Sequence, residues 1–106
     1  MIDKHKILAD LKIHLRQNYG DSIKDVILFG SQARGDSNKD SDYDILVILK
    51  QDYTHQDERK IINLCYDIDL KYDIIIDVHI LSTKELKSLR GKQPIFINAL
   101  RNGIYA

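Results

Sequence analysis

Two short runs of consecutive apolar residues constrain the fold of this chain more than any other feature. Val26–Phe29 and Ile45–Leu49 contain no polar side chain. Because side chains alternate between the two faces of a strand, an unbroken apolar run predicts a strand that is buried on both faces. We therefore expect a sheet with other elements packed on it.

The rest of the sequence supplies helices for this sheet and a third strand. In order, the predicted elements are a helix over 3–19, a strand over 26–29, a loop over 30–41, a strand over 45–49, a helix over 54–70, a strand over 72–81, a short helix from the capping box of Ser82 and Glu85, and a last helix between Pro94 and Gly103. The third strand, YDIIIDVHIL, carries Asp73, Asp77 and His79 on one face. This order predicts an α/β (α+β) protein with one sheet and helices packed on it.

Length and composition are those of a soluble globular protein with one domain over residues 1–106. The 16 basic residues balance 16 acidic ones, so no overall positive charge favours nonspecific binding of nucleic acid. The single cysteine, Cys65, excludes a disulfide within the chain. The charged N-terminus lacks the apolar stretch of a signal peptide, and no run approaches about 18 apolar residues, so we expect a cytoplasmic protein without a membrane span.

Asp42 and Asp44 open the second apolar strand, which is an unusual place for two carboxylates. In a strand they point to the same side with about 6–7 Å between their Cα atoms, and like charges this close raise each other's pKa unless a cation lies between them. The 12 residues from Gly30 to Ser41 join two strands that we expect to be neighbours. If these strands are antiparallel, Gly30 lies where Asp42 and Asp44 begin the next strand.

This arrangement predicts a site for a metal nucleoside triphosphate. Glycine lets the backbone approach a ligand closely, while exposed amides, the Ser31 hydroxyl and Arg34 suit phosphate oxygens. The carboxylates suit Mg²⁺, which binds a few protein oxygens together with substrate phosphates. Asp77 is costly to bury in mid-strand without a partner. If the third strand lies beside the second, Asp77 completes a three-carboxylate cluster that can hold two metal ions and accept the proton of an attacking hydroxyl. Asp73 is its rival for this role, and His79 shares the same face.

The segment GSQARGDSNKDSDYD, residues 30–44, resembles the signature of nucleotidyltransferases, which is Gly-Ser, ten residues and then Asp-X-Asp. In a chain this short, GSxARG followed by SDxD is similar to the minimal nucleotidyltransferases, whose fold resembles the palm of DNA polymerase β. The resemblance implies a polymerase β-like fold with a small mixed sheet. It also implies that the nucleotide is contacted by Gly30, Ser31, Arg34 and Ser41. The catalytic metal ligands that it implies are the triad of Asp42, Asp44 and Asp77.

By this resemblance the chain is a Mg²⁺-dependent enzyme that transfers AMP from ATP to a hydroxyl group and releases pyrophosphate. Many stand-alone members are antitoxins that silence a HEPN-type RNase toxin by adding AMP to a tyrosine. We therefore expect such a toxin as partner. The chain then forms either a hetero-oligomer with this toxin or a homo-oligomer. A single domain leaves no room for an acceptor-binding domain, which also favours a protein acceptor. Two alternatives stay open: transfer to RNA such as a tRNA end, and a non-catalytic antitoxin that neutralises its partner by binding.

Overall fold

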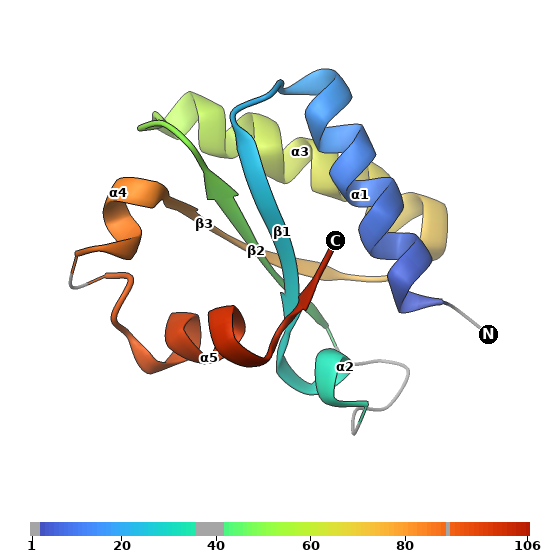
Figure 1. Ribbon diagram of the computed structural model, residues 1–106. Helices are drawn as coiled ribbons and strands as arrows, with labels where there is room; N and C mark the ends of the chain where they lie inside the picture. The colour runs from blue at the N-terminus through green and yellow to red at the C-terminus, as the bar shows by residue number, and fades with distance from the viewer. Residues whose placement is uncertain (1–2, 36–41, 89) are drawn as a thin grey trace.

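The computed structural model describes residues 3–35, 42–88 and 90–106, and these form a four-stranded mixed sheet with helices on both faces (Figure 1). The strands are β1 (Ile23–Phe29), β2 (Tyr43–Leu49), β3 (Ile76–Ser82) and β4 (Ile104–Tyr105), in the order β3-β2-β1-β4. β1 is antiparallel to both β2 and β4, whereas β2 and β3 are parallel. The two apolar runs are therefore the central strands, where burial on both faces is expected.

The helices cover the two faces of the sheet unequally. α1 (Lys4–Asn18) and α3 (His55–Tyr72) pack against each other on one face, and α5 (Pro94–Asn102) packs on the other (Figure 1). α2 (Gly30–Arg34) and α4 (Thr83–Leu86) are short helices that directly follow β1 and β3. None of the helices in the described segments has the length and apolar character that crossing a membrane requires.

Side-chain alternation in the central strands divides the core into two clusters. The cluster toward α1 and α3 includes Val26, Leu28, Ile45 and Val47, and the cluster toward α5 includes Ile27, Phe29, Leu46 and Ile48. Each of these side chains is at most 4% exposed. Full burial of an aliphatic or aromatic side chain contributes about 1.5–3 kcal/mol, so both faces stabilise the sheet.

Local signals set the ends of the last two helices as predicted. The Ser82 side chain accepts a hydrogen bond from the backbone amide of Glu85, and the Glu85 carboxylate accepts one from the amide of Ser82, which is the predicted capping box of α4. Pro94 lies in the first turn of α5, where a missing amide hydrogen is harmless. Gly103 follows the last residue of α5.

Two local predictions differ from the structure, and one short strand was not predicted. Gly30–Arg34 were expected in a loop and form α2, and Ile104–Tyr105 form β4, which is too short for any periodicity to reveal. Asp73 was expected in the third strand but ends α3, with a φ of 54° that aspartate tolerates better than most residues. Because β3 begins only at Ile76, the prediction that Asp73 lies on this strand beside Asp77 is wrong.

Candidate active site

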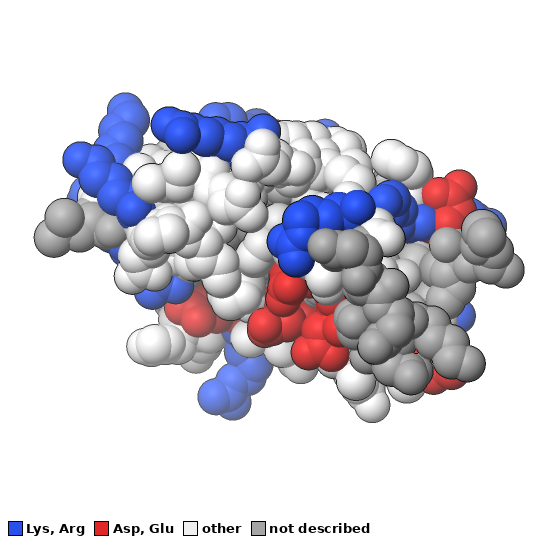
Figure 2. Space-filling model, turned by 90° about the horizontal axis from the view of Figure 1, so that it is seen from below, with Lys and Arg blue, Asp and Glu red and all other residues white. Residues whose placement is uncertain are grey.

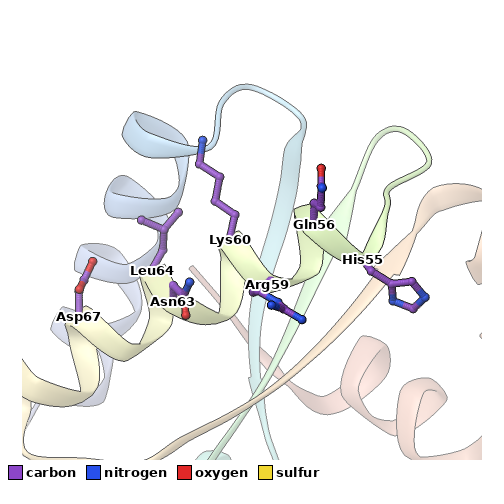
Figure 3. Close-up of a pocket in the computed structure, with 7 residues that line it drawn as sticks. All are labelled: His55, Gln56, Arg59, Lys60, Asn63, Leu64 and Asp67. Carbon is purple, nitrogen blue, oxygen red and sulfur yellow. The ribbon is translucent and has the colours of Figure 1, made fainter.

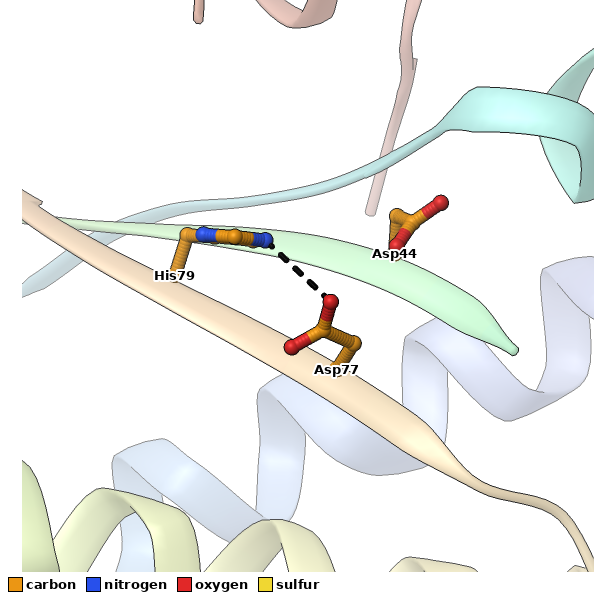
Figure 4. Close-up of side chains that lie close together, drawn as sticks. All are labelled: Asp44, Asp77 and His79. Atoms are coloured by element: carbon orange, nitrogen blue, oxygen red, sulfur yellow. Dashed lines mark ion pairs between the residues drawn. The ribbon is translucent and has the colours of Figure 1, made fainter. Parts of the chain in front are cut away.

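Two aspartates lie side by side where β2 and β3 begin (Figure 4). Asp44 and Asp77 are Cα partners in the parallel ladder, so their side chains leave the same face of the sheet. On its other side Asp44 pairs with Phe29, the last residue of β1. Both conditions on which the expected site depends therefore hold, because β1 and β2 are antiparallel and β3 lies beside β2.

His79 joins the two carboxylates. One carboxylate oxygen of Asp44, one of Asp77 and one ring nitrogen of His79 lie within 4.8 Å of one another. Nε2 of His79 is 3.5 Å from Oδ2 of Asp77, the contact that is dashed in Figure 4. The sequence placed His79 on this face but not among the site residues. Its spacing of two residues from Asp77 was the signal that points to the cluster.

Gly30 leaves the space that the Asp44 carboxylate occupies. Its φ is +76°, a left-handed conformation that side chains rarely adopt. A Cβ atom added to Gly30 would lie 2.3 Å from Oδ2 of Asp44, which is closer than atoms can approach. The sequence predicted a close approach at this glycine, and within the chain the approaching group is a carboxylate.

Partial burial and a nearby negative charge raise the pKa of Asp44. Partial burial is the largest cause and the charge of Asp77 is the next, while His79 and Arg34 act in the opposite direction. A raised pKa means that keeping this carboxylate ionised costs free energy of folding. A bound cation would relieve this cost, so the site is arranged to receive positive charge.

The other predicted site residues surround the aspartate pair to different degrees. Asp42 is exposed and directly precedes β2, and its charge also raises the pKa of Asp44, but it is not one of the three clustered donors. Ser31 is half-buried in α2, and Arg34 is exposed at the end of this helix. Ser41 lies outside the described residues. The structure thus gathers part of the predicted triad and leaves Asp42 at its edge.

Two hollows differ in their relation to these donors. A hollow of about 300 Å³ between α2 and α5 adjoins the site through Gly30, and its lining residues are Phe29, Gly30, Ala33, Arg34, Asn98 and Asn102. A larger hollow of about 570 Å³ follows the outer surface of α3 (Figure 3). It contains none of the clustered donors, and its one acidic residue, Asp67, is paired with His14. The smaller hollow is therefore the one with reactive groups beside it.

Acidic and basic side chains lie next to each other on one face of the molecule (Figure 2). On the face seen from below, acidic side chains gather near the centre, with Lys and Arg side chains beside them (Figure 2). The chain as a whole is neutral, with 16 basic and 16 acidic residues. Positive and negative groups side by side suit a ligand that combines phosphates with a divalent cation.

Comparison with known proteins gives a consistent result. The sequence matches the nucleotidyltransferase domain family over residues 8–105. Two proteins of Methanocaldococcus jannaschii, each named "Putative protein adenylyltransferase", are similar to it. One is 32% identical over 102 residues, which are 96% of this chain and 96% of the relative. The other is 39% identical over 71 residues, which are 67% of this chain and 72% of the relative.

Solved structures share the fold. One described as a "putative minimal nucleotidyltransferase" has a TM-score of 0.60 and 27% identity, and the match covers 97% of this chain and 95% of that chain. A toxin-antitoxin structure with AMP-PNP has a TM-score of 0.61 and 18% identity, over 97% of this chain and 72% of that chain. Spectinomycin adenyltransferase AAD(9) from Enterococcus faecialis, with ATP and spectinomycin, has a TM-score of 0.63 and 21% identity, over 81% of this chain and 37% of that chain. The fold is the polymerase β-like nucleotidyltransferase fold, as predicted.

Sequence, fold and site therefore agree. The family match spans residues 8–105, and one relative is 32% identical over 96% of the chain. The motif over residues 30–44 ends at Asp44, which the sheet places beside Asp77. This chain belongs to the nucleotidyltransferase domain family.

Proposed function

We propose that this chain is a Mg²⁺-dependent adenylyltransferase that transfers AMP from ATP to a hydroxyl group of a protein. The observation that carries the proposal is the in-register pair of Asp44 and Asp77, packed where Gly30 leaves room for a carboxylate. Paired carboxylates at a glycine turn suit a metal nucleotide. The names of the two relatives from M. jannaschii support a protein as the acceptor.

The donor set fits Mg²⁺, the ion that the family implies. Mg²⁺ binds one or two carboxylates together with waters and substrate phosphates. Asp44 and Asp77 offer such oxygens on neighbouring strands, with Asp42 at the edge. A cation offsets the burial and the repulsion from Asp77 that raise the pKa of Asp44. When bound, one or two such ions stabilise the attacking and leaving oxygens of an in-line displacement.

The residues of α2 suit the triphosphate. The Ser31 hydroxyl donates to a phosphate oxygen, and the Arg34 guanidinium adds positive charge near the end of the same helix. The adjoining hollow of about 300 Å³ offers the amide groups of Asn98 and Asn102 to the rest of the nucleotide. ATP therefore lies with its phosphates toward Asp44 and its nucleoside toward α5.

Asp77 is placed to accept a proton from the acceptor. Its side chain is 56% exposed, so a hydroxyl group carried by another protein reaches it from solvent. The hydroxyl oxygen attacks the α-phosphorus, the bond to the β-phosphate oxygen breaks, and the proton passes to the Asp77 carboxylate. The products are an AMP ester of the acceptor and pyrophosphate.

We infer that the acceptor is a tyrosine of a HEPN-type toxin, so that the chain acts as an antitoxin. Two observations support this inference: the motif over residues 30–44, and the similarity in fold to a solved structure that is described as a toxin-antitoxin. Adding AMP to a tyrosine removes a phenol hydroxyl and introduces a negative charge, and a negative charge repels the phosphates of an RNA substrate. The open position of Asp77 suits a macromolecular acceptor.

The test uses the protein encoded by the gene next to the gene of this chain. Its intact mass is measured after incubation with this chain, ATP and Mg²⁺. We expect a gain of whole AMP units, and a loss of at least about 100-fold in rate for Asp77→Asn, the scale for removing one group that stabilises a transition state. Asp67→Asn is the matched control, because Asp67 is also a 56% exposed aspartate that contacts a histidine. The proposal would be overturned if AMP were added to RNA and not to the protein. It would also be overturned if the Asp77→Asn chain still neutralised the toxin.

A further inference from the structure

His79 is the member of the cluster that the motif does not explain. A ring nitrogen of His79 lies within 4.8 Å of carboxylate oxygens of both Asp44 and Asp77. We propose that His79 gives this nitrogen to a metal ion held by Asp44 and Asp77, so that the site binds Co²⁺, Zn²⁺ and Mn²⁺ more tightly than Mg²⁺. The inference rests on the proposed function, because it assumes that the two carboxylates hold a divalent ion.

The sheet fixes the relative positions of the three donors. Asp44 and Asp77 face each other across the parallel ladder, and His79 pairs with Leu46, two residues further along both strands. Side chains two residues apart in a strand leave the same face, so the imidazole stands next to the carboxylate pair. All three donors come from strands and none from a loop, which limits how far they can separate (Figure 4).

Two aromatic rings hold the imidazole in place. The centre of the His79 ring is 5.7 Å from that of Phe29 and 5.9 Å from that of Phe96, the latter in an edge-to-face arrangement. Phe29 ends β1 and Phe96 belongs to α5, so a strand and a helix each supply one ring contact to the imidazole. The side chain remains 29% exposed, which leaves an edge open to a ligand. A donor already oriented loses little conformational entropy when it binds.

The chemistry of the donor set decides which ion it favours. Mg²⁺ is a hard cation that prefers oxygen, and an imidazole adds little to its binding. Imidazole nitrogen is a good ligand for first-row transition ions, and affinity for a mixed nitrogen and oxygen site rises from Mn²⁺ through Co²⁺, with Zn²⁺ also binding strongly. A site of two carboxylates and one imidazole therefore distinguishes these ions from Mg²⁺, whereas a site of oxygens alone does so much less.

The chain contains a matched pair that lacks the second carboxylate. Nε2 of His14 is 2.8 Å from Oδ2 of Asp67, and the exposed fractions of the two side chains, 29% and 56%, equal those of His79 and Asp77. Among the described residues, His14 and Asp67 belong to no group of three donors. If His79 served only as the partner of Asp77, it would respond to metal ions as His14 does.

The test is a titration of the ¹⁵N-labelled chain with Zn²⁺ alone, followed through the imidazole nitrogens by NMR, with affinities for Zn²⁺ and Mg²⁺ measured by calorimetry. We expect Nε2 of His79 to shift on Zn²⁺ binding while His14 stays unchanged. His79→Phe keeps an aromatic ring next to Phe29 and Phe96 and removes the nitrogen. It should weaken Zn²⁺ binding by about 10-fold or more and Mg²⁺ binding by less than about twofold. His14→Phe should change neither.

The outcomes separate this inference from the proposed function. A Zn²⁺ affinity that is the same in wild type and His79→Phe, or a His79 nitrogen that does not shift in the wild-type chain, would overturn the inference. If Mg²⁺ still binds and Asp44→Asn abolishes that binding, the proposed function stands without it. If neither ion binds in a way that depends on Asp44, both fail. The NMR shift is measured on the wild-type chain, so it decides the matter even if a variant does not fold.

Discussion

The two faces of the sheet share the same strands and differ in what they bury. Under α1 and α3 the face is apolar along the whole of β2, with Tyr43, Ile45, Val47 and Leu49 in one core cluster. Under α5 the same strand presents Leu46 and Ile48 to the core and then Asp44 to the cluster with Asp77. One strand therefore serves a core on one side and both a core and a polar site on the other.

This difference separates stability from chemistry within one small sheet. On the first face, each buried side chain favours folding because its apolar surface is removed from contact with water. On the second face, burial and the charge of Asp77 raise the pKa of Asp44, so the ionised site opposes folding. Substitutions on the two faces should therefore change stability and metal binding in different proportions.

The largest loss of stability is expected for Leu11→Ala on the first face. Leu11 belongs to α1, is 0% exposed and lies in the core cluster. Replacing a buried leucine by alanine typically costs about 2–5 kcal/mol, which urea unfolding measures. Ile13→Ala is the control, because Ile13 is 54% exposed and should change stability by about 0.5 kcal/mol or less. The folded Leu11→Ala chain should bind Mg²⁺ as the wild type does, and a weaker affinity would show that the two faces are coupled.

A smaller loss of stability, with a large loss of metal binding, is expected for Gly30→Ala. The substitution forces alanine into a left-handed conformation, at a cost of about 1–2 kcal/mol, and places its Cβ on the Asp44 carboxylate. Gly35→Ala is a matched control, because Gly35 has the same φ of +76° and an added Cβ there meets no described atom within 4 Å. Both variants should lose similar backbone stability, but only Gly30→Ala should lose Mg²⁺ affinity in calorimetry. Equal affinities in the two variants would argue against a role of Gly30 in placing Asp44.

Most of the fold followed from periodicity and local capping. The unbroken apolar runs predicted β1 and β2, because burial on both faces leaves a direct trace in the residues. The start of β3 was missed, because the side chain of Asp69 accepts a hydrogen bond from the amide of Ile76 and Asp73 takes a left-handed conformation. Such an arrangement depends on individual hydrogen bonds, which a hydrophobic pattern does not record.

The site was predictable where it depends on strand register and not where it depends on packing. Asp44 and Asp77 each open an apolar strand, so neighbouring strands bring them together. The His79 ring contacts Phe29 and Phe96, and its contact with Phe96 exists only once α5 has packed on the sheet. Periodicity places His79 on the right face, but it cannot show which tertiary neighbours orient it.

The smallest effect on stability, and one of opposite sign, is expected for Asp44→Asn without metal. The pKa of Asp44 in the folded chain is raised above its ordinary value of 3.8, so the proton on this carboxylate favours folding. That contribution is complete below pH 3.8 and is lost as the pH rises through the raised value. Asparagine keeps the uncharged form at every pH. The variant should therefore match the wild type near about pH 4 and exceed it by about 0.5–1 kcal/mol near about pH 7, the scale of partly solvated charges.

Mg²⁺ should reverse this ranking. A ligand that binds only the folded chain stabilises it by about 2.7 kcal/mol at 100 times its dissociation constant, so the wild type gains stability and Asp44→Asn gains much less. Asp67→Asn, which removes the carboxylate beside His14, should respond to Mg²⁺ as the wild type does. Thermal unfolding of the three chains with and without Mg²⁺ measures all of these changes. Asp44→Asn is to be compared with the wild type in metal-free buffer near neutral pH. If the variant is no more stable, the ionised carboxylate does not oppose folding, and the proposed difference between the two faces is wrong.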